Sequence, residues 1–234
     1  EEKANRVCQL AREYGAGLVA LTIDEEGMAK TADRKVAVAK RLYDIACGRW
    51  GIDPGALLFD PLTFTIGSGD ADSRDAAIQT LGGVQGIKDA LPGVKTLLGL
   101  SNVSFGLKPY ARQILNSVFL AEAIQCGLDS AIVSPAKILP LSKLSPEDIA
   151  LTRDLIYDQR REGYDPLFAF IGRFADTKGD SASSQVESGT LEERLAGRII
   201  DGKKTGIESL LEEALNAGYK PLDIINKVLL EGMK

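Results

Sequence analysis

The sequence predicts an α/β protein built on a parallel β-sheet, followed by a small group of helices. Four short apolar runs, each typical of a buried strand, alternate with longer stretches whose apolar residues recur at helical spacing. Strands and helices that alternate in this way form right-handed crossovers and a parallel sheet. From residue 176 to 189 the chain becomes rich in Ser, Asp, Gly and Lys, which is typical of a linker.

The individual elements follow one another regularly along the chain. Apolar runs predict strands over residues 17–23, 56–59, 96–100 and 130–133. Helical spacing of apolar residues predicts helices over residues 1–15, 31–48, 73–90, 109–126, 145–162 and 166–174. Glycines after the first helix are its stop signal, and Ser145-Pro146 is an N-cap and first-turn pair that starts the fifth.

Each predicted strand is followed by a polar side chain: Asp24, Asp60, Asn102 and Ser134. In a barrel, functional groups gather at the C-terminal strand ends, whereas an open sheet needs them only at its switch point. Four polar ends in succession therefore favour the C-terminal part of an eight-stranded (β/α)8 TIM-type barrel. Four strands cannot close such a barrel, and the chain begins without Met, so we expect a fragment of a longer protein.

The residues after the linker predict an incomplete helical bundle. Thr190 and Glu193 form a capping box, and two further amphipathic helices follow, over about 205–217 and from Pro221 onward. The predicted organisation is a partial barrel over 1–175, a linker over 176–189 and a partial helical module over 190–234.

Composition excludes several classes of function. The net charge of −5 and the pI near 5.0, without a Lys/Arg cluster, argue against a nucleic-acid partner. No apolar stretch of about 18 residues or charged leader is found, so we expect no membrane partner and a cytoplasmic location. Histidine is absent, which removes Ser-His-Asp catalysis and His-ligated zinc. Cys8, Cys47 and Cys126 suit free thiols.

Several motifs have simple structural interpretations. The acidic run 24–27 lacks the ligand spacing of an EF-hand, so a solvated loop is preferred and no metal is expected. The glycines of 67–69 and 82–86 do not fit phosphate sites, because the first run lacks a Lys and the second interrupts a helix. Ser101-Asn102 alone is typical of a strand-ending turn. In this setting, Asp60 and Asn102 can instead bind two edges of a planar heterocycle.

Four segments in this order and spacing resemble the folate (pterin-binding) barrel of the cobalamin-dependent methionine synthases: Asp24 to Ala29, Phe59 to Phe64, Gly99 to Leu107 and Ala131 to Pro135. The tail from Leu191 through the Gly-Tyr-Lys-Pro-Leu-Asp segment at 218–223 to Lys234 resembles the start of the helical cobalamin-cap module of that family. The resemblance covers essentially the whole chain.

The resemblance implies a methyltransferase. In the family, the barrel presents 5-methyltetrahydrofolate to cob(I)alamin, whose cobalt attacks the N5 methyl group, and homocysteine finally becomes methionine. By analogy, Asp60 binds the pterin ring N–H and amino groups, and Asn102 hydrogen-bonds near N5 as the catalytic residue. Arg112 matches a folate-contacting arginine, and Ser134 and Asp24 or Glu25 are mouth residues.

The resemblance also implies that much of the machinery lies outside this chain. Cobalamin would be bound mainly by the cobalamin domain of the same parent protein, and zinc would belong to the homocysteine domain of the parent. The family's first three barrel strands are absent, so we expect the isolated chain to be inactive.

Two alternatives remain open. Another pterin-barrel enzyme, such as a corrinoid protein methyltransferase or a dihydropteroate synthase, would share the barrel but would have no reason to carry the appended helices. A non-catalytic interaction module is favoured if the chain is complete and associates with itself to close its sheet.

Overall fold

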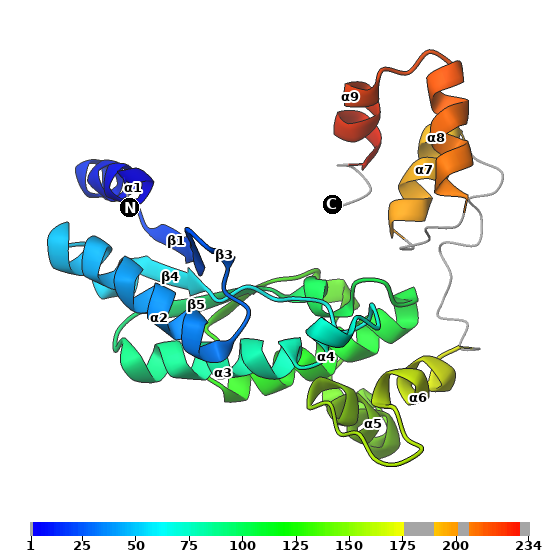
Figure 1. Ribbon diagram of the computed structural model, residues 1–234, viewed down its shortest axis with the longest axis horizontal. Coiled ribbons are helices and arrows are strands. Elements are labelled where there is room, and N and C mark those ends of the chain that lie inside the picture. Colours follow the sequence, from blue (N-terminus) through cyan, green and yellow to red (C-terminus); the bar gives the residue numbers. More distant parts are fainter. Residues whose placement is uncertain (1, 176–189, 201–205, 230–234) are drawn as a thin grey trace.

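The computed structural model describes residues 2–175, 190–200 and 206–229, and it shows an α/β fold with a parallel sheet (Figure 1). The helices are α1 Glu2–Tyr14, α2 Ala32–Tyr43, α3 Ala76–Ala90, α4 Pro109–Gln125, α5 Pro146–Ile156, α6 Pro166–Arg173, α7 Leu191–Ile200, α8 Ile207–Asn216 and α9 Pro221–Asp223. Wider π-helical turns continue α2 over Asp44–Arg49 and α9 over Ile224–Leu229.

Four strands form the parallel sheet, in the order β1-β4-β5-β6. They are β1 Leu18–Leu21, β4 Leu57–Asp60, β5 Lys95–Gly99 and β6 Ser130–Ile132. The sheet order follows the chain order, and every neighbouring pair is parallel. A separate two-stranded hairpin, β2 Ile23–Asp24 with β3 Gly27–Met28, branches off directly after β1.

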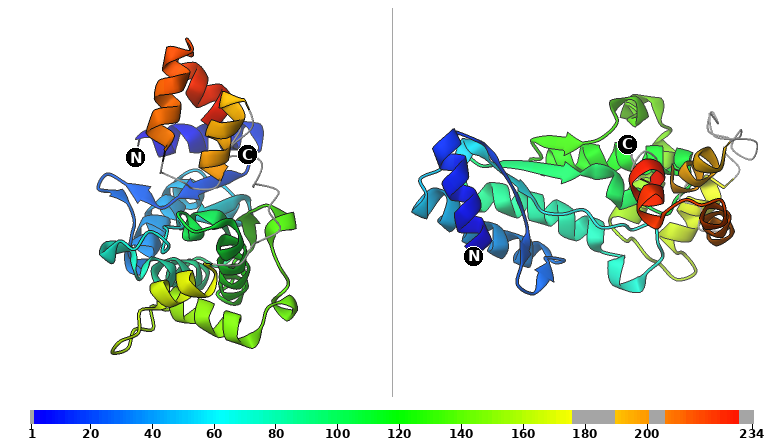
Figure 2. Two further views of the ribbon diagram at one scale, coloured as in Figure 1. Left: turned by 90° about the vertical axis from the view of Figure 1, so that its right-hand side faces the viewer. Right: turned by 90° about the horizontal axis from the view of Figure 1, so that it is seen from above.

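The two faces of the sheet differ in how they are covered. Helices α2, α3 and α4 lie along one face, and both figures show them stacked against the strands (Figures 1 and 2). Side chains on that face, among them Phe59 and Leu98, are completely buried. On the opposite face Val19 and Ile132 are 53% and 65% exposed. We call this second side the open face.

Close contact between α2 and α3 depends on glycine. A Cβ added at Gly83 would lie 2.6 Å from Cδ of Lys35, and one added at Gly86 would lie 2.6 Å from Cγ2 of Val36. Helices approach this closely only where one surface lacks side chains. The glycine run 82–86, which sequence analysis rejected as a phosphate site, is therefore a helix-packing surface.

The predicted helix starts are largely confirmed. Ser145 Oγ accepts the N–H of Asp148 at the start of α5, at 3.0 Å. The capping box before α7 is present, because Thr190 N–H donates to Glu193 at 2.9 Å and Glu193 N–H donates to Thr190 Oγ1 at 3.3 Å. Helices α7 to α9 pack around a small core of their own, made of Leu195, Leu210, Ala214 and Ile224.

Several predicted boundaries are wrong, among them the start of the helix expected over 73–90, which begins at Ala76. The helix expected over 145–162 ends at Ile156, because Asp158 adopts a left-handed backbone conformation with φ 45° and a short Arg161–Tyr164 bridge follows. The strand expected over 17–23 ends at Leu21, since the backbone of Thr22 bends into the β2–β3 hairpin. The predicted linker 176–189 lies outside the described residues, as do the side chains predicted to be apolar at 199, 200, 228 and 229.

Cys8, Cys47 and Cys126 are free thiols, as predicted. Within the described ranges, no helix combines the length and the apolar character needed to cross a membrane.

The one-sided burial leads to a stability prediction. Phe59→Ala should lower the free energy of unfolding of the 234-residue chain by about 3–5 kcal/mol, because it leaves a cavity under the helices. Leu21→Ala, on the open face of the neighbouring strand, should cost far less, since the side chain of Leu21 is exposed. Urea unfolding of both variants measures the difference. Equal losses would contradict the one-sided core.

Candidate functional site

The C-terminal ends of the parallel strands meet at one edge of the sheet. Asp60 is the last residue of β4, and β5 leads into a tight turn, Leu100–Ser104, that carries Asn102. The pairing of Leu58 with Lys95 places Asp60 and Gly99 on the same side of the sheet. Gly99 in turn pairs with the exposed Ile132, so this side is the open face. The register therefore brings Asp60 and Gly99, the residue that ends β5 before the Asn102 turn, to one edge and one face.

The carboxylate of Asp60 is held in place by its own turn. Its Oδ1 accepts the backbone N–H of Leu62 at 2.8 Å, and Leu62 adopts a left-handed conformation with φ 64°. Burial raises the pKa of Asp60, while the Leu62 N–H and the positive charge of Lys35 act in the opposite direction. Among the described residues, Oδ2 has no hydrogen-bond donor, so one carboxylate oxygen is left for a ligand.

The side chain of Asn102 is exposed and lies beside Gly99. A Cβ added at Gly99 would lie 3.5 Å from Nδ2 of Asn102. The turn is fixed through the backbone, because the Asn102 carbonyl accepts the N–H of Phe105 at 3.2 Å. No residue in the described part of the chain hydrogen-bonds to the side-chain amide of Asn102. The amide can therefore both donate and accept hydrogen bonds at the open face.

The loops that follow β4 and β5 are bonded to each other. The N–H of Ile66 donates to the carbonyl of Val103 at 3.0 Å, and Oγ1 of Thr65 donates to the carbonyl of Phe105 at 2.8 Å. A Cβ at Gly67 would lie 2.7 Å from Cγ of Leu107, so the two loops are in close contact. These bonds tie the segment after Asp60 to the turn that carries Asn102.

Arg112 lies at the start of α4 and hydrogen-bonds to the Leu100–Ser104 turn, which carries Asn102. Its Nε donates to Oγ of Ser104 at 3.2 Å, and one terminal nitrogen donates to the carbonyl of Ser101 at 3.3 Å. Burial lowers the pKa of the Arg112 guanidinium. The predicted contact of Arg112 with folate stays a prediction. The structure shows that Arg112 hydrogen-bonds to Ser101 and Ser104, on either side of Asn102.

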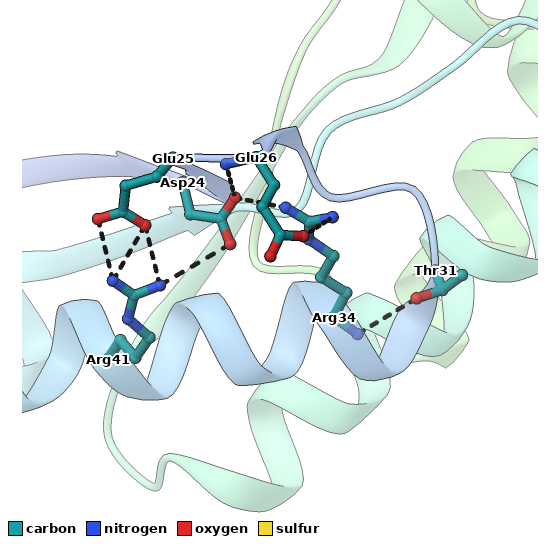
Figure 3. Close-up of polar contacts among 6 residues, drawn as sticks. All are labelled: Asp24, Glu25, Glu26, Thr31, Arg34 and Arg41. Carbon is teal, nitrogen blue, oxygen red and sulfur yellow. Dashed lines mark hydrogen bonds and ion pairs between the residues drawn. The ribbon is translucent and has the colours of Figure 1, made fainter.

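The acidic run after β1 is turned toward α2, as Figure 3 shows. Arg34 pairs with Asp24 at 2.5 Å and with Glu26 at 2.9 Å, while Arg41 pairs with Glu25 at 3.1 Å. Burial raises the pKa of Asp24, but hydrogen bonds from Arg34 and from the Glu26 N–H outweigh it and hold that pKa below its usual value.

These ion pairs change how the acidic run is understood. Asp24 lies on β2, one bend beyond the end of β1, and its carboxylate already has two arginine partners. The structure therefore places Asp24 and Glu25 in a surface network that fastens the hairpin to α2. Their assignment as mouth residues stays a prediction.

Ser134 follows β6 at the same edge of the sheet. Its side chain is exposed, and its carbonyl accepts the N–H of Lys137 at 2.9 Å, which starts a short turn. The described ranges contain no cluster of three or more His, Cys, Asp or Glu side chains that could hold a metal ion.

Sequence analysis missed Lys35, a completely buried lysine of α2 whose charge acts on Asp60. A lysine in an amphipathic helix ordinarily indicates an exposed position. The available signal was the glycine run 82–86, which opens space for a long side chain on the facing helix.

Two family profiles and two curated relatives match this chain. The profile of the family described as "Pterin binding enzyme" matches residues 1–134, and that of "B12 binding domain" matches residues 191–234. Proteins named "Methionine synthase" from Mycobacterium tuberculosis and Mycobacterium leprae are 47% and 46% identical over 241 and 238 residues. Each alignment covers 100% of this chain and 20% of the relative.

The chain thus spans about a fifth of the length of these curated relatives. The pterin match includes β1, β4, β5 and β6, together with Asp60, Asn102 and Ser134. The sheet, its polar edge and the matched profile concern the same residues. This chain belongs to the family of pterin binding enzymes.

Proposed function

We propose that this chain is the folate-binding part of a cobalamin-dependent methyltransferase. The reaction moves the N5 methyl group of 5-methyltetrahydrofolate to cobalamin and on to homocysteine, which makes methionine. One observation carries the proposal: Asp60 and Asn102 share the open face at one edge of a sheet whose residues match the pterin binding enzymes. A B12-binding match in the same chain, and relatives named for methionine synthesis, support the acceptor and the product.

Asp60 suits recognition of the pterin ring. A pterin presents a ring N–H and an exocyclic amino group side by side, and a carboxylate accepts hydrogen bonds from both. In the structure the backbone of Leu62 uses Oδ1, which retains further lone pairs, and Oδ2 is available. The half-buried position strengthens such bonds, because the effective dielectric constant there is lower than in water.

Asn102 suits the reacting end of the same ligand. The nitrogen that loses the methyl group must gain a proton for the amine to leave, and a fixed amide dipole stabilises the charge that develops there. The turn that carries Asn102 is held by Arg112 and by the neighbouring loop, so the backbone of Asn102 is in place before the ligand arrives. This arrangement needs no histidine, and the sequence contains none.

We propose further that the sheet is the C-terminal part of a (β/α)8 barrel. Neighbouring strands follow the chain order without reversal, and the crossover helices α2, α3 and α4 all lie on one face, as expected for consecutive barrel strands. The open face would then be the barrel interior. The proposed divisions are the barrel portion 1–175, the linker 176–189 and the helical cap module 190–234, and the two profile matches fall on either side of that linker.

The helical module exposes several apolar side chains. Leu215, Leu222 and Ile225 are 49%, 71% and 48% exposed on α8, α9 and the turn after it. Exposed apolar side chains of this kind suit the broad, mainly apolar ring of a corrin. When bound, cobalamin would supply the cobalt centre that accepts the methyl group. We expect zinc to be held elsewhere in the parent, and the three free thiols suit a cytoplasmic location.

We expect Asp60→Asn to weaken folate binding and to raise the melting temperature of the chain. In the full gene product that carries this chain, Asp60→Asn should weaken 5-methyltetrahydrofolate binding by roughly 10–100-fold in calorimetry, since a charged hydrogen-bond acceptor is lost. Asp89→Asn, an exposed carboxylate of α3, is the control and should bind normally.

The same variant should raise the melting temperature of the ligand-free chain at pH 7. The folded-state pKa of Asp60 is raised, so its ionised form costs stability above that pKa. The advantage of Asp60→Asn should shrink as pH falls, because the carboxyl group is then protonated in both the folded and unfolded states. A lower melting temperature at pH 7 would contradict the assigned burial.

Asn102 is predicted to act on the rate more than on affinity. Asn102→Ala in the full gene product should slow methyl transfer on the order of 10²-fold or more, while folate affinity changes less than about tenfold. Single-turnover kinetics and calorimetry measure the two quantities. Gln85→Ala, an amide on α3 away from the open face, is the matched control. Equal effects on rate and affinity would remove the transition-state role.

A further inference from the structure

Lys35 is a buried cation whose three hydrogen bonds all go to backbone carbonyls. Its Nζ donates to Ala29 at 2.9 Å, to Pro61 at 2.5 Å and to Leu62 at 3.2 Å, which uses all three N–H groups of the ammonium. The side chain is 0% exposed. Two of the three acceptors belong to the residues immediately after Asp60.

The surroundings of Lys35 are built to hold it. Gly83 of α3 leaves space for the lysine stem, because a Cβ there would lie 2.6 Å from Cδ of Lys35. The ring of Phe64 lies under the ammonium, with its centroid 4.9 Å from Nζ. Burial lowers the pKa of Lys35 to about 8, while the negative charge of Asp60 acts to raise it. Burying a lysine is costly, and packing of α2 alone does not require one.

The segment that Lys35 holds is strained and leads directly to the carboxylate of Asp60. Leu62 adopts a left-handed conformation with φ 64°, which is unfavourable for a leucine. Its carbonyl accepts Lys35 and lies 3.1 Å from Oγ1 of Thr80, whose single proton is shared with the nearer Ala76 carbonyl at 2.8 Å. Its N–H donates to Oδ1 of Asp60 at 2.8 Å. The ammonium of Lys35 thus holds the peptide whose N–H orients the carboxylate.

We infer that Lys35 is a positioning residue for pterin binding, which acts by holding the Pro61–Leu62 turn so that the Asp60 carboxylate faces the ligand. The inference rests on the proposed function, because it assigns Lys35 to the same folate site. It goes further in naming a residue on the covered face of the sheet domain that acts on a ligand at the open face. Lys35 does not itself touch the ligand.

A purely structural lysine would make a different prediction. If Lys35 only fastens α2 to the sheet, its loss would lower stability and would affect ligand binding equally whether or not Asp60 carries a carboxylate. A lysine that acts through Asp60 should matter much less once that carboxylate is gone. A double-mutant cycle between the two residues separates these cases.

The experiment measures 5-methyltetrahydrofolate affinity by calorimetry in the full gene product, for Lys35→Met, Asp60→Asn and the double variant. Lys35→Met should weaken binding about tenfold or more, since orientation of the carboxylate is lost. In the Asp60→Asn background the same change should have little further effect. Lys88→Met is the control: Lys88 also donates to a backbone carbonyl, that of Val94 at 3.1 Å, and it pairs with Asp129 at 2.9 Å, beside the N-terminal ends of the strands.

The outcomes are distinct. If Lys35→Met weakens binding equally in both backgrounds, or no more than Lys88→Met does, the positioning role is overturned. If the unmodified protein fails to bind the folate, the proposed function fails and this inference fails with it. If the unmodified protein binds and Lys35→Met binds equally well, only the inference about Lys35 fails.

A milder variant keeps the test valid if Lys35→Met does not fold. Thr80→Val removes the hydroxyl that is shared between the Leu62 and Ala76 carbonyls and preserves the size of the side chain. It should weaken folate binding measurably in the unmodified background and have little effect with Asp60→Asn. Unchanged binding by folded Thr80→Val would contradict the claim that this turn orients the carboxylate.

Discussion

The parallel pairing of four strands in chain order is the constraint on which the rest of the sheet domain depends. Each crossover helix must return along the same face, so that face is buried and the other is left open. The same pairing brings the C-terminal strand ends to one edge. Asp60 and Gly99 are far apart in sequence, and the register of β4 with β5 places them on one face, with the Asn102 amide beside Gly99.

The proposed site depends on two charged side chains, Asp60 and Lys35, whose burial lowers the stability of the fold. Burial raises the pKa of Asp60, and the buried ammonium of Lys35 is balanced by carbonyl groups and by the nearby carboxylate. Neither group is needed to fill the core, since aliphatic side chains would pack without desolvation cost. Their retention beside a strained turn at Leu62 is typical of a site where orientation matters more than stability.

Much of this fold can be predicted from sequence because the strands are mostly apolar runs and several helices, among them α2, α5 and α6, begin at a capping side chain. Asp60 and Asn102 are predictable as polar residues directly after such runs. The β2–β3 hairpin is not, because two-residue strands leave no periodic signal. The ion pairs of Asp24 with Arg34 and of Glu25 with Arg41 join a loop to a helix, and no local pattern reveals them. Lys35 escapes prediction because helical periodicity cannot distinguish a buried lysine from an exposed one.

The central claim is that the open face holds a pterin between the carboxylate of Asp60 and the amide of Asn102. A crystal structure of the full gene product with 5-methyltetrahydrofolate tests it most directly. The account predicts the ring N–H and amino groups within hydrogen-bond distance of Asp60 and the N5 atom beside the side chain of Asn102. A pterin bound elsewhere, with Asp60 and Asn102 free of it, would contradict the account.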